Sequence, residues 1–223
     1  MEAVIKVGGS LARHSEALKT LCKKLSEMAK KHRLLIVPGG GEFADVVRET
    51  EKRFPLSAYV SHKMAVLGMD QFGLLLSELI PKAVAIGSLE KAKDYWKSET
   101  TPVFLPSKLM FREEPLEASW DVTSDSIAAF VACRVKADMI ILVKDVDGIF
   151  SSDPKTDAAA KLIKEISASA LSKRGGETAV DRYLPRVLLS EGLDCYIVNG
   201  LYPERIMQVL DGEETTCTLI AAE

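Results

Sequence analysis

Residues 3–10 read Ala-Val-Ile-Lys-Val-Gly-Gly-Ser, and this stretch sets the architecture of the chain. A short apolar run rich in β-branched residues is typical of a strand that is covered on both faces of a parallel sheet. The two glycines after it let backbone amides approach an anion closely, and a following helix would add its positive N-terminal end. Lys6 is a charge inside this run, so it either faces a cavity or an anion, or it points to solvent from an edge strand. The stretch therefore predicts a strand that ends in an anion-binding loop.

Similar apolar runs recur along the chain and alternate with segments of helical spacing. The helical pattern is clearest from Leu18 to Ala29, where apolar residues repeat on one face and lysines fill the other. The alternation predicts an α/β fold, a three-layer αβα sandwich with a mostly parallel central sheet and ligands at the carboxyl ends of its strands. Pro185 leaves the bounds of one expected helix open. The expected strands are 3–7, 34–37, 83–86, 102–105, 139–143, 195–198 and 218–221, and the other expected helices are 42–53, 63–79, 124–136, 179–191 and 203–210.

Three glycines, Gly39, Gly40 and Gly41, follow the second expected strand. Together with Ala44 they match G-x-G-x-x-A, the start of a dinucleotide-binding fingerprint. That fingerprint also needs an acidic residue about 20 positions further on, at the end of another strand. The region near Val60 has the pattern of a helix start instead. The missing acidic residue therefore argues against a nicotinamide site. The three glycines still favour a second anion or substrate cradle, and the alternative is a purely structural tight turn.

Two further loops carry polar residues beside expected strands or helices. The first residues of Thr123–Ser126 can cap the helix expected at 124–136, and Asp125 in its first turn complements the helix dipole. Capping does not explain why small polar groups fill the whole stretch. The second loop, Lys144–Phe150, follows a buried strand and contains two carboxylates, a lysine and a glycine. Its Asp-x-Asp pattern could suggest calcium, but the remaining ligand spacing of a calcium loop is absent.

The composition limits the class of protein. The chain has 223 residues and a net charge of -3, without the clustered basic surplus of nucleic-acid-binding proteins. It has no secretion signal at its start and no apolar run near the ~20 residues that span a bilayer, so no membrane partner is expected. The four cysteines form no CxxC pair, which favours reduced thiols in the cytoplasm over disulfides or a zinc site. The P-loop, GxSxG and HExxH motifs are absent, and among the scattered histidines His62 is the one to watch.

Taken together and in this order, the loops resemble those of the amino-acid kinase family over essentially the whole chain. The most specific matches are Lys6–Ser10, Thr123–Ala129 and Lys144–Phe150, and Ile197–Gly200 is a weaker one. The resemblance implies the carbamate kinase-like fold, ATP as co-substrate with Mg²⁺, a small-molecule acceptor and a homo-oligomer. It also implies two halves on one continuous sheet. Residues 1–115 would carry the acceptor-binding and phosphoryl-transfer loops, and residues 116–223 the nucleotide-binding loops.

The resemblance also gives roles to single residues. Lys6 would stabilise the transferring phosphoryl group with the amides of Gly8 and Gly9, and Asp125 would orient this lysine. The interpretation therefore depends on Lys6 and Asp125 meeting in one cleft. The acceptor would lie against Gly39, Gly40, Gly41, Asp45 and Thr123. The nucleotide would contact Ser10, Lys144, Asp145, Val146, Asp147, Gly148, Phe150, Asp153 and Pro154, and no protein ligand to a metal is expected.

Within the family, Pro38–Asp45, His62–Gly73 and Trp120–Ala129 are most similar to the archaeal kinases of methanofuran biosynthesis. Those kinases convert (5-(aminomethyl)furan-3-yl)methyl phosphate to its diphosphate. A phosphate monoester is largely ionised at neutral pH, because its second pKa is about 6, and it needs no general base. The lack of a well-placed histidine therefore mildly favours a phosphate or carboxylate acceptor, although Asp125 could act as a base. The alternatives are a uridylate, isopentenyl phosphate or carboxylate kinase of this fold, and a non-catalytic nucleotide sensor.

Two departures from the family pattern leave questions open. Several members have a second catalytic lysine after a glycine turn, whereas no lysine follows the turn at 175–181. Lys144, Arg182 and Arg186 are the candidates for this second cation. At residues 216–218 the chain reads Thr-Cys-Thr where the family often has Gly-Thr. This difference is expected to affect a turn more than catalysis.

Overall fold

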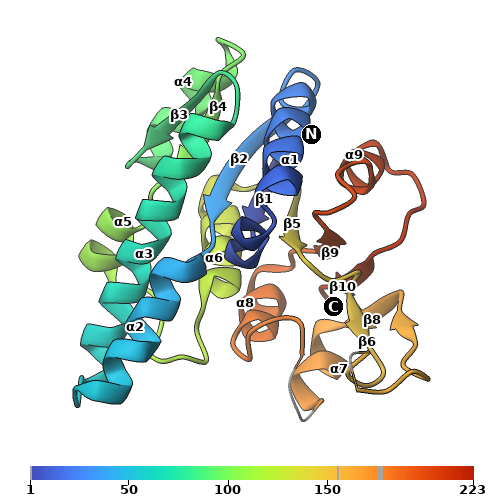
Figure 1. Cartoon of the computed structure of the whole chain (residues 1–223). Helices are drawn as coiled ribbons and strands as arrows, with labels where there is room; N and C mark the ends of the chain where they lie inside the picture. Colours follow the sequence, from blue (N-terminus) through green and yellow to red (C-terminus); the bar gives the residue numbers. More distant parts are fainter. Residues whose placement is uncertain (1, 155, 175–177) are drawn as a thin grey trace.

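The computed structural model of the protein describes residues 2–154, 156–174 and 178–223 (Figure 1). Its centre is an eight-stranded sheet with the strand order β3-β4-β2-β1-β5-β9-β10-β8. Neighbouring strands of this sheet run parallel, except for β9 and β10, which pair antiparallel. A second, two-stranded sheet joins β6 and β7. The strands are β1 Glu2–Val7, β2 Arg33–Pro38, β3 Ala83–Ile86, β4 Thr101–Phe104, β5 Met139–Lys144, β6 Ile149–Phe150, β7 Leu162–Ile163, β8 Glu165–Ser167, β9 Cys195–Asn199 and β10 Thr218–Ala221.

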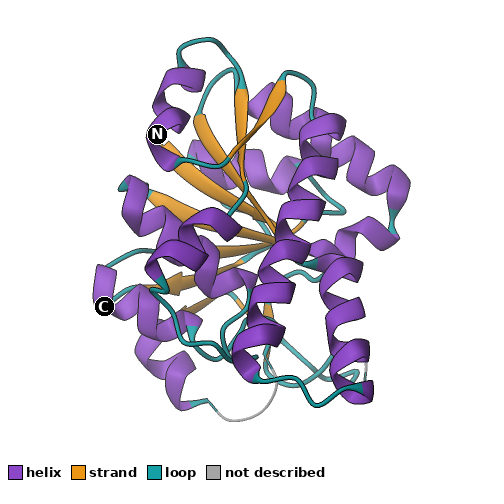
Figure 2. Ribbon diagram, turned by 90° about the vertical axis from the view of Figure 1, so that its left-hand side faces the viewer, coloured by secondary structure: helices purple, strands orange, loops and turns teal. Residues whose placement is uncertain are grey.

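Helices cover both faces of the central sheet, which gives the expected three layers (Figure 2). Apolar side chains of α1 and α9 pack on one face, and those of α6 and α8 pack on the other. Two short 3₁₀ helices, η1 Gly9–Arg13 and η2 Leu89–Lys91, follow β1 and β3. The α-helices are α1 Ser15–Met28, α2 Gly41–Arg53, α3 Ala58–Leu79, α4 Ala92–Trp96, α5 Ser107–Glu113, α6 Ser124–Val135, α7 Ala168–Lys173, α8 Leu184–Glu191 and α9 Glu204–Asp211.

The side chains of β1 alternate between the two faces of the sheet, because successive residues of a strand point in opposite directions. Ala3, Ile5 and Val7 belong to the apolar core on the side of α1, whereas Val4 belongs to the core on the side of α6. Lys6 shares the face of Val4 and therefore projects toward α6. Because β1 has β2 on one side and β5 on the other, the alternative of a solvent-facing lysine on an edge strand is wrong.

Every expected strand is present, with ends that differ by at most one residue. The helix expected at 179–191 is wrong at its start, because α8 begins at Leu184. Pro185 lies in its first turn, where the missing N–H of proline does no harm. The helix α3 begins at Ala58, earlier than expected, because the Ser57 side chain accepts a hydrogen bond from the N–H of Val60 and caps it.

The short elements were not expected from the sequence. The helices α4, α5 and α7 and the strands β6, β7 and β8 are too short to show a periodic pattern, and tertiary packing stabilises them. Across the described ranges, the helices lack the combination of length and apolar character that a membrane-crossing segment needs.

Candidate active site

Two lysines converge on one carboxylate at the carboxyl ends of β1 and β5. Lys6 Nζ lies 2.8 Å from Oδ1 of Asp125, and Lys144 Nζ lies 2.8 Å from Oδ2 of the same residue. Lys6 and Asp125 are buried, and Lys144 is half-buried. The register explains the convergence, because Lys6 pairs with Leu142, which places Lys144 two residues further along the neighbouring strand, on the same face. Lys6 and Asp125 thus meet as the kinase interpretation requires, and a second lysine joins them.

Burial and charge oppose each other in this cluster. Burial alone would raise the pKa of Asp125, but the charges of Lys144 and Lys6 outweigh it and lower the pKa below the ordinary 3.8. Burial lowers the pKa of Lys6 below the ordinary 10.5, and the attraction of Asp125 only partly offsets this. The contact between Lys6 and Oδ1 is an ion pair, since this oxygen has no hydrogen bond of acceptable geometry within the described part of the chain. With two lysines and one carboxylate, the cluster has a surplus positive charge that a phosphate could neutralise.

Asp181 explains the small polar residues of Thr123–Ser126. Its Oδ2 accepts hydrogen bonds from the N–H of Thr123 at 2.9 Å, from the Thr123 hydroxyl at 2.8 Å and from the N–H of Ser126 at 3.0 Å. Its Oδ1 accepts a hydrogen bond from the Ser126 hydroxyl at 2.5 Å. The N–H of Asp181 in turn donates to Oδ2 of Asp125 at 3.3 Å. These bonds fix the start of α6 and hold Asp125 toward the lysines.

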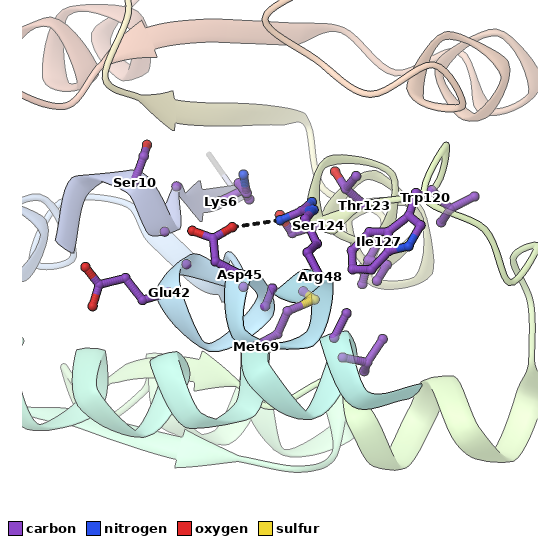
Figure 3. A pocket seen from close by; sticks show the side chains of 18 of the residues that line it. Lys6, Ser10, Glu42, Asp45, Arg48, Met69, Trp120, Thr123, Ser124 and Ile127 are labelled. Atoms are coloured by element: carbon purple, nitrogen blue, oxygen red, sulfur yellow. Dashed lines mark hydrogen bonds and ion pairs between the residues drawn. The ribbon is translucent and has the colours of Figure 1, made fainter. Parts of the chain in front are cut away.

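The cluster adjoins a cavity of about 390 Å³ (Figure 3). Figure 3 shows Ser10 on one side of this cavity, Lys6 between, and Trp120 with Ile127 on the opposite side. Asp125 lies behind its two lysines and does not reach the cavity wall. The expected site residues that line the cavity are Lys6, Gly8, Gly9, Ser10, Gly40, Gly41, Asp45, Thr123, Lys144, Asp145 and Val146. The expected residues outside its wall are Gly39, Asp147, Gly148, Phe150, Asp153 and Pro154.

The two glycine loops touch each other. A Cβ on Gly9 would lie 2.1 Å from the backbone nitrogen of Gly41, and a Cβ on Gly39 would lie 2.6 Å from the nitrogen of Gly9. Gly41 has a φ of +54°, which favours glycine. The Gly8 amide, which was expected to donate to a phosphate, donates to the carbonyl of Val143 at 2.7 Å instead. The amides of Gly9 and Ser10, at the start of η1, have no partner inside that helix and are the remaining donors of this loop, because the N–H of Leu11 donates to the carbonyl of Gly8.

The loop after β5 is held by C-terminal segments of the chain. Asp147 accepts hydrogen bonds from Arg205 Nη1 at 2.6 Å and from Asn199 Nδ2 at 2.9 Å. Gly148 has a φ of +150°, and a Cβ there would lie 2.2 Å from the Thr218 hydroxyl. This hydroxyl also accepts a hydrogen bond from the N–H of Ile149 at 2.9 Å. The Thr-Cys-Thr departure thus places Thr218 where it fastens the expected nucleotide loop.

Among the candidates for a second cation, Lys144 lies at Asp125. Arg182 and Arg186 instead line a separate cavity of about 500 Å³, bordered by α7 and α8. Residues 175–177 of the glycine turn lie outside the described residues, so the turn at 175–181 can be followed only from Thr178 on.

Sequence reasoning missed three residues that line the cavity, which are Arg13, Arg48 and Trp120. Arg13 Nη2 lies 3.0 Å from Oδ2 of Asp45, and Arg48 Nη1 lies 2.9 Å from Oδ1 of the same carboxylate. The Arg48 guanidinium also stacks 4.4 Å from the centre of the Trp120 ring. The pairing of Arg48 with Asp45 was visible in the sequence as a spacing of three on one helix. Arg13 and Trp120 reach the cavity through tertiary packing, for which the sequence has no comparable signal.

His62 also lines the cavity. Burial lowers its pKa below the ordinary 6.5, although a hydrogen bond with the backbone of Ser119 opposes the shift. The imidazole is therefore mostly neutral at pH 7 and is no fixed positive charge for a phosphate. Apolar residues make up much of the remaining lining, which consists of Ala44, Ala58, Ala65, Val66, Met69, Val122, Ile127 and Ala179 together with the polar Glu42, Ser119 and Ser124.

Comparisons with known proteins agree with this geometry. A family model described as Amino acid kinase family matches residues 1–199. A [5-(aminomethyl)furan-3-yl]methyl phosphate kinase from Methanocaldococcus jannaschii is 35% identical over 219 residues, which cover 97% of this chain and 96% of that protein. A uridylate kinase from Archaeoglobus fulgidus is 25% identical over 222 residues, which cover 96% of this chain and 97% of that protein.

Solved structures share the fold. The crystal structure of uridylate kinase from Archaeoglobus fulgidus has a TM-score of 0.78 at 24% identity and covers 99% of this chain and 100% of its own. The UMP kinase from Bacillus anthracis has a TM-score of 0.77 at 18% identity and covers 100% of this chain and 96% of its own. The resemblance that the loops indicated is therefore confirmed over nearly the whole chain. This chain belongs to the Amino acid kinase family.

Proposed function

We propose that this protein is an ATP-dependent kinase that phosphorylates (5-(aminomethyl)furan-3-yl)methyl phosphate to its diphosphate, a step of methanofuran biosynthesis. The observation that carries the proposal is the Lys6–Asp125–Lys144 cluster beside a cavity that also holds Arg13 and Arg48. Fixed cations are what phosphoryl transfer between two anionic substrates needs. The 35% identity to the Methanocaldococcus jannaschii kinase, over nearly the full length of both chains, supports the choice of acceptor.

In the proposed reaction, two ammonium groups share the charge of the transferring phosphoryl group. Phosphoryl transfer is loose and in line, so positioning and charge neutralisation supply most of the catalysis. Lys6 and Lys144 approach from neighbouring strands, and Asp125 holds each Nζ at 2.8 Å. The amide of Gly9 would donate to the same phosphoryl oxygens. The acceptor phosphate is ionised at neutral pH, with a second pKa of about 6, and attacks without a general base, so the neutral His62 need not remove a proton.

We place the nucleotide on the loop after β5. Lys144, the last residue of β5, and Asp145, the first residue of the loop, reach the cavity, and Arg205 and Thr218 hold the centre of the loop. Within residues 2–154, 156–174 and 178–223, no three His, Cys, Asp or Glu side chains gather as a metal site. Magnesium would therefore be held mainly by the phosphates of ATP and by water, and it would neutralise phosphate charge when bound. The other roles in the proposed phosphoryl transfer are assigned to side chains and backbone amides of the protein.

Rates of ADP release with a panel of acceptors test the proposal. The panel contains the aminomethylfuran phosphate, UMP, isopentenyl phosphate, glutamate and carbamate, at one concentration of ATP and magnesium. We expect the highest kcat/KM with the aminomethylfuran phosphate. The matched control is Lys6→Met, which keeps the aliphatic stem but removes the ammonium. It should lower kcat about 10²–10³-fold while ATP still binds.

The second candidate is a uridylate kinase, which the 25% identity to the Archaeoglobus fulgidus protein favours. Turnover with UMP alone would establish this candidate and refute the proposed acceptor. Turnover with a carboxylate alone would refute both. ATP binding without turnover on any acceptor would identify a nucleotide sensor instead.

We also propose that the protein assembles into a homo-oligomer through α3. Val60, Leu67 and Leu74 follow one another at intervals of seven residues, so they form one stripe, and their exposures are 42%, 45% and 54%. An apolar stripe of this kind is typical of a protein interface. Light scattering should show a dimer or larger assembly that Leu67→Glu with Leu74→Glu dissociates, and a monomeric wild type would refute this interface.

We place the reaction in the cytoplasm. The four cysteines are free thiols, and two of them, Cys22 and Cys195, are fully buried. Free thiols are what a reducing compartment maintains, which supports this placement.

A further inference from the structure

Trp120 is the largest side chain in the wall of the cavity, and the proposed phosphoryl transfer does not use it. Its Nε1–H donates a hydrogen bond to Oε2 of Glu51 at 2.7 Å. The other oxygen of Glu51 accepts a hydrogen bond from the hydroxyl of Ser61 at 2.9 Å, and Ser61 is buried. Both oxygens of this half-buried carboxylate are therefore committed to neutral donors. Such bonds to a carboxylate are short and directional, so Glu51 fixes the orientation of the indole.

Arg48 holds the same indole from another direction. Its guanidinium lies 4.4 Å from the centre of the Trp120 ring, and it also bonds Asp45 at 2.9 Å. Asp45 is in turn bound by Arg13 at 3.0 Å. The ring is thus held at its Nε1–H by α2 and covered on one face by a cation that is itself tethered to α2. An aromatic wall fixed in this way presents a constant shape to whatever enters the cavity.

The position of Trp120 determines what it can contact. In Figure 3 it lies with Ile127 on the side of the cavity away from Ser10, and Lys6 lies between. If the acceptor phosphate lies at Lys6, an organic group that points away from Ser10 extends toward Trp120. Met69 and Val122 are further apolar residues of the cavity lining. A single flat ring fits against an aromatic and apolar wall, whereas a nucleoside monophosphate continues through a sugar into a base and needs space beyond it.

We propose that Trp120, positioned by Glu51, restricts the acceptor to phosphate monoesters with one small ring and excludes nucleoside monophosphates. This inference rests on the proposed function, because it takes the acceptor phosphate to lie at Lys6. Trp120 is the specificity-determining residue, and Glu51 acts only through it as a positioning residue.

Steady-state kinetics with benzyl phosphate and UMP as acceptors test the inference. In Trp120→Ala, the ratio of kcat/KM for benzyl phosphate to kcat/KM for UMP should fall at least about tenfold, as expected when one side chain of a pocket sets its size. The change should lie mainly in KM, because the lysine cluster is untouched. Glu51→Ala should shift the ratio in the same direction, whereas Glu51→Gln, which keeps an oxygen for the indole, should not. If Glu51 were merely structural, Glu51→Ala would lower the rates for both acceptors equally.

A fluorescence titration gives a measurement that needs no turnover and remains usable if Trp120→Ala folds poorly. The chain has two tryptophans, and the other, Trp96, lies in α4, where it donates to the carbonyl of Leu34. Trp96→Phe therefore leaves Trp120 as the sole tryptophan. Benzyl phosphate or the aminomethylfuran phosphate, added without ATP, should change its emission saturably. The matched control, Trp120→Phe with Trp96 intact, should show no change.

The two hypotheses fail in different ways. If the wild type transfers phosphate to no phosphate monoester, the proposed function is refuted. If the wild type phosphorylates the aminomethylfuran phosphate, but Trp120→Ala keeps the acceptor ratio or Trp120 emission ignores the acceptor, the role of Trp120 is refuted and the proposed function stands.

Discussion

Replacing Lys144 by methionine should separate activity from stability. The wild-type cluster contains two lysines and one carboxylate, each lysine 2.8 Å from Asp125. Lys144→Met leaves the balanced pair of Lys6 and Asp125, and the methionine fills most of the vacated volume. We expect the free energy of unfolding to change by less than about 1 kcal/mol, since exchanging a buried charge for an apolar group is often neutral when no unpaired charge remains. The activity should still fall about 10²–10³-fold in kcat, because one fixed cation at the phosphoryl group is lost.

Asp125→Asn is the opposite change, because it leaves two ammonium groups without the carboxylate that both of them contact. The loss of one partner of a buried ion pair costs about 3–5 kcal/mol. For a chain of this size, about 2–4 °C per kcal/mol makes the fall in Tm about 6–20 °C. Thermal unfolding and kcat, measured on both variants, test the charge balance. Lys19→Met on α1, where the side chain is 54% exposed, controls for the general effect of the substitution. Equal destabilisation by Lys144→Met and Asp125→Asn, or near-normal turnover of Lys144→Met, would refute the reasoning.

Three further expectations concern the charge, the nucleotide loop and the glycines. The free energy of unfolding should decrease as the pH falls below 3.8, because the pKa of Asp125 is lower in the folded protein and the unfolded chain therefore binds the proton first. Urea titrations at several pH values should show a smaller dependence of the free energy of unfolding on pH in Asp125→Asn. Arg205→Ala should raise the KM for ATP about tenfold with little change in the KM for the acceptor, because a charged hydrogen bond of about 1.5–3 kcal/mol holds the nucleotide loop. Arg205→Lys should restore part of the lost affinity for ATP. Gly9→Ala should lower both Tm and kcat, because its Cβ would meet the nitrogen of Gly41 at 2.1 Å. A Cβ on Gly87 would meet no atom of the described residues within 4 Å, so equal effects of Gly9→Ala and Gly87→Ala on Tm and kcat would contradict this.

The strands could be predicted from the sequence because their signal is local. A buried parallel strand reads as a continuous apolar run, so β3 and β10 were placed with both ends correct. The helix α8 was extended too far because its apolar spacing continues upstream of Leu184. The competing influence was Asp181, whose Oδ1 accepts the N–H of Leu184 at 2.8 Å and thereby begins the helix there. That contact depends on the tertiary position of Asp181 and leaves no periodic trace.

The candidate site was predictable only in part, for a similar reason. Lys6 stood out because a charge inside an apolar strand has few stable environments. The meeting of Lys6 with Lys144 requires the pairing of β1 with β5, whose paired residues are more than 130 positions apart in the chain. Trp120 could be named in the sequence as part of a matching segment, but its bond to Glu51 spans 69 positions. Side chains brought together across such distances are set by the topology, which a single sequence reveals only through resemblance.

In β1, the alternation of side chains places the lysine of the site on one face of the sheet and apolar core residues on the other. Ile5 and Val7 flank Lys6 and point into the opposite core. A one-residue insertion or deletion ahead of Lys6 would turn the ammonium into the apolar layer on the side of α1 and turn a valine or isoleucine toward Asp125. A chain with that one-residue shift would bury the ammonium of Lys6 without a partner and would leave the carboxylate of Asp125 without Lys6. Folded forms in which β1 is shifted by one residue should therefore be too unstable to accumulate. The position of Lys6 in β1 thereby helps to select the correct register of this strand during folding.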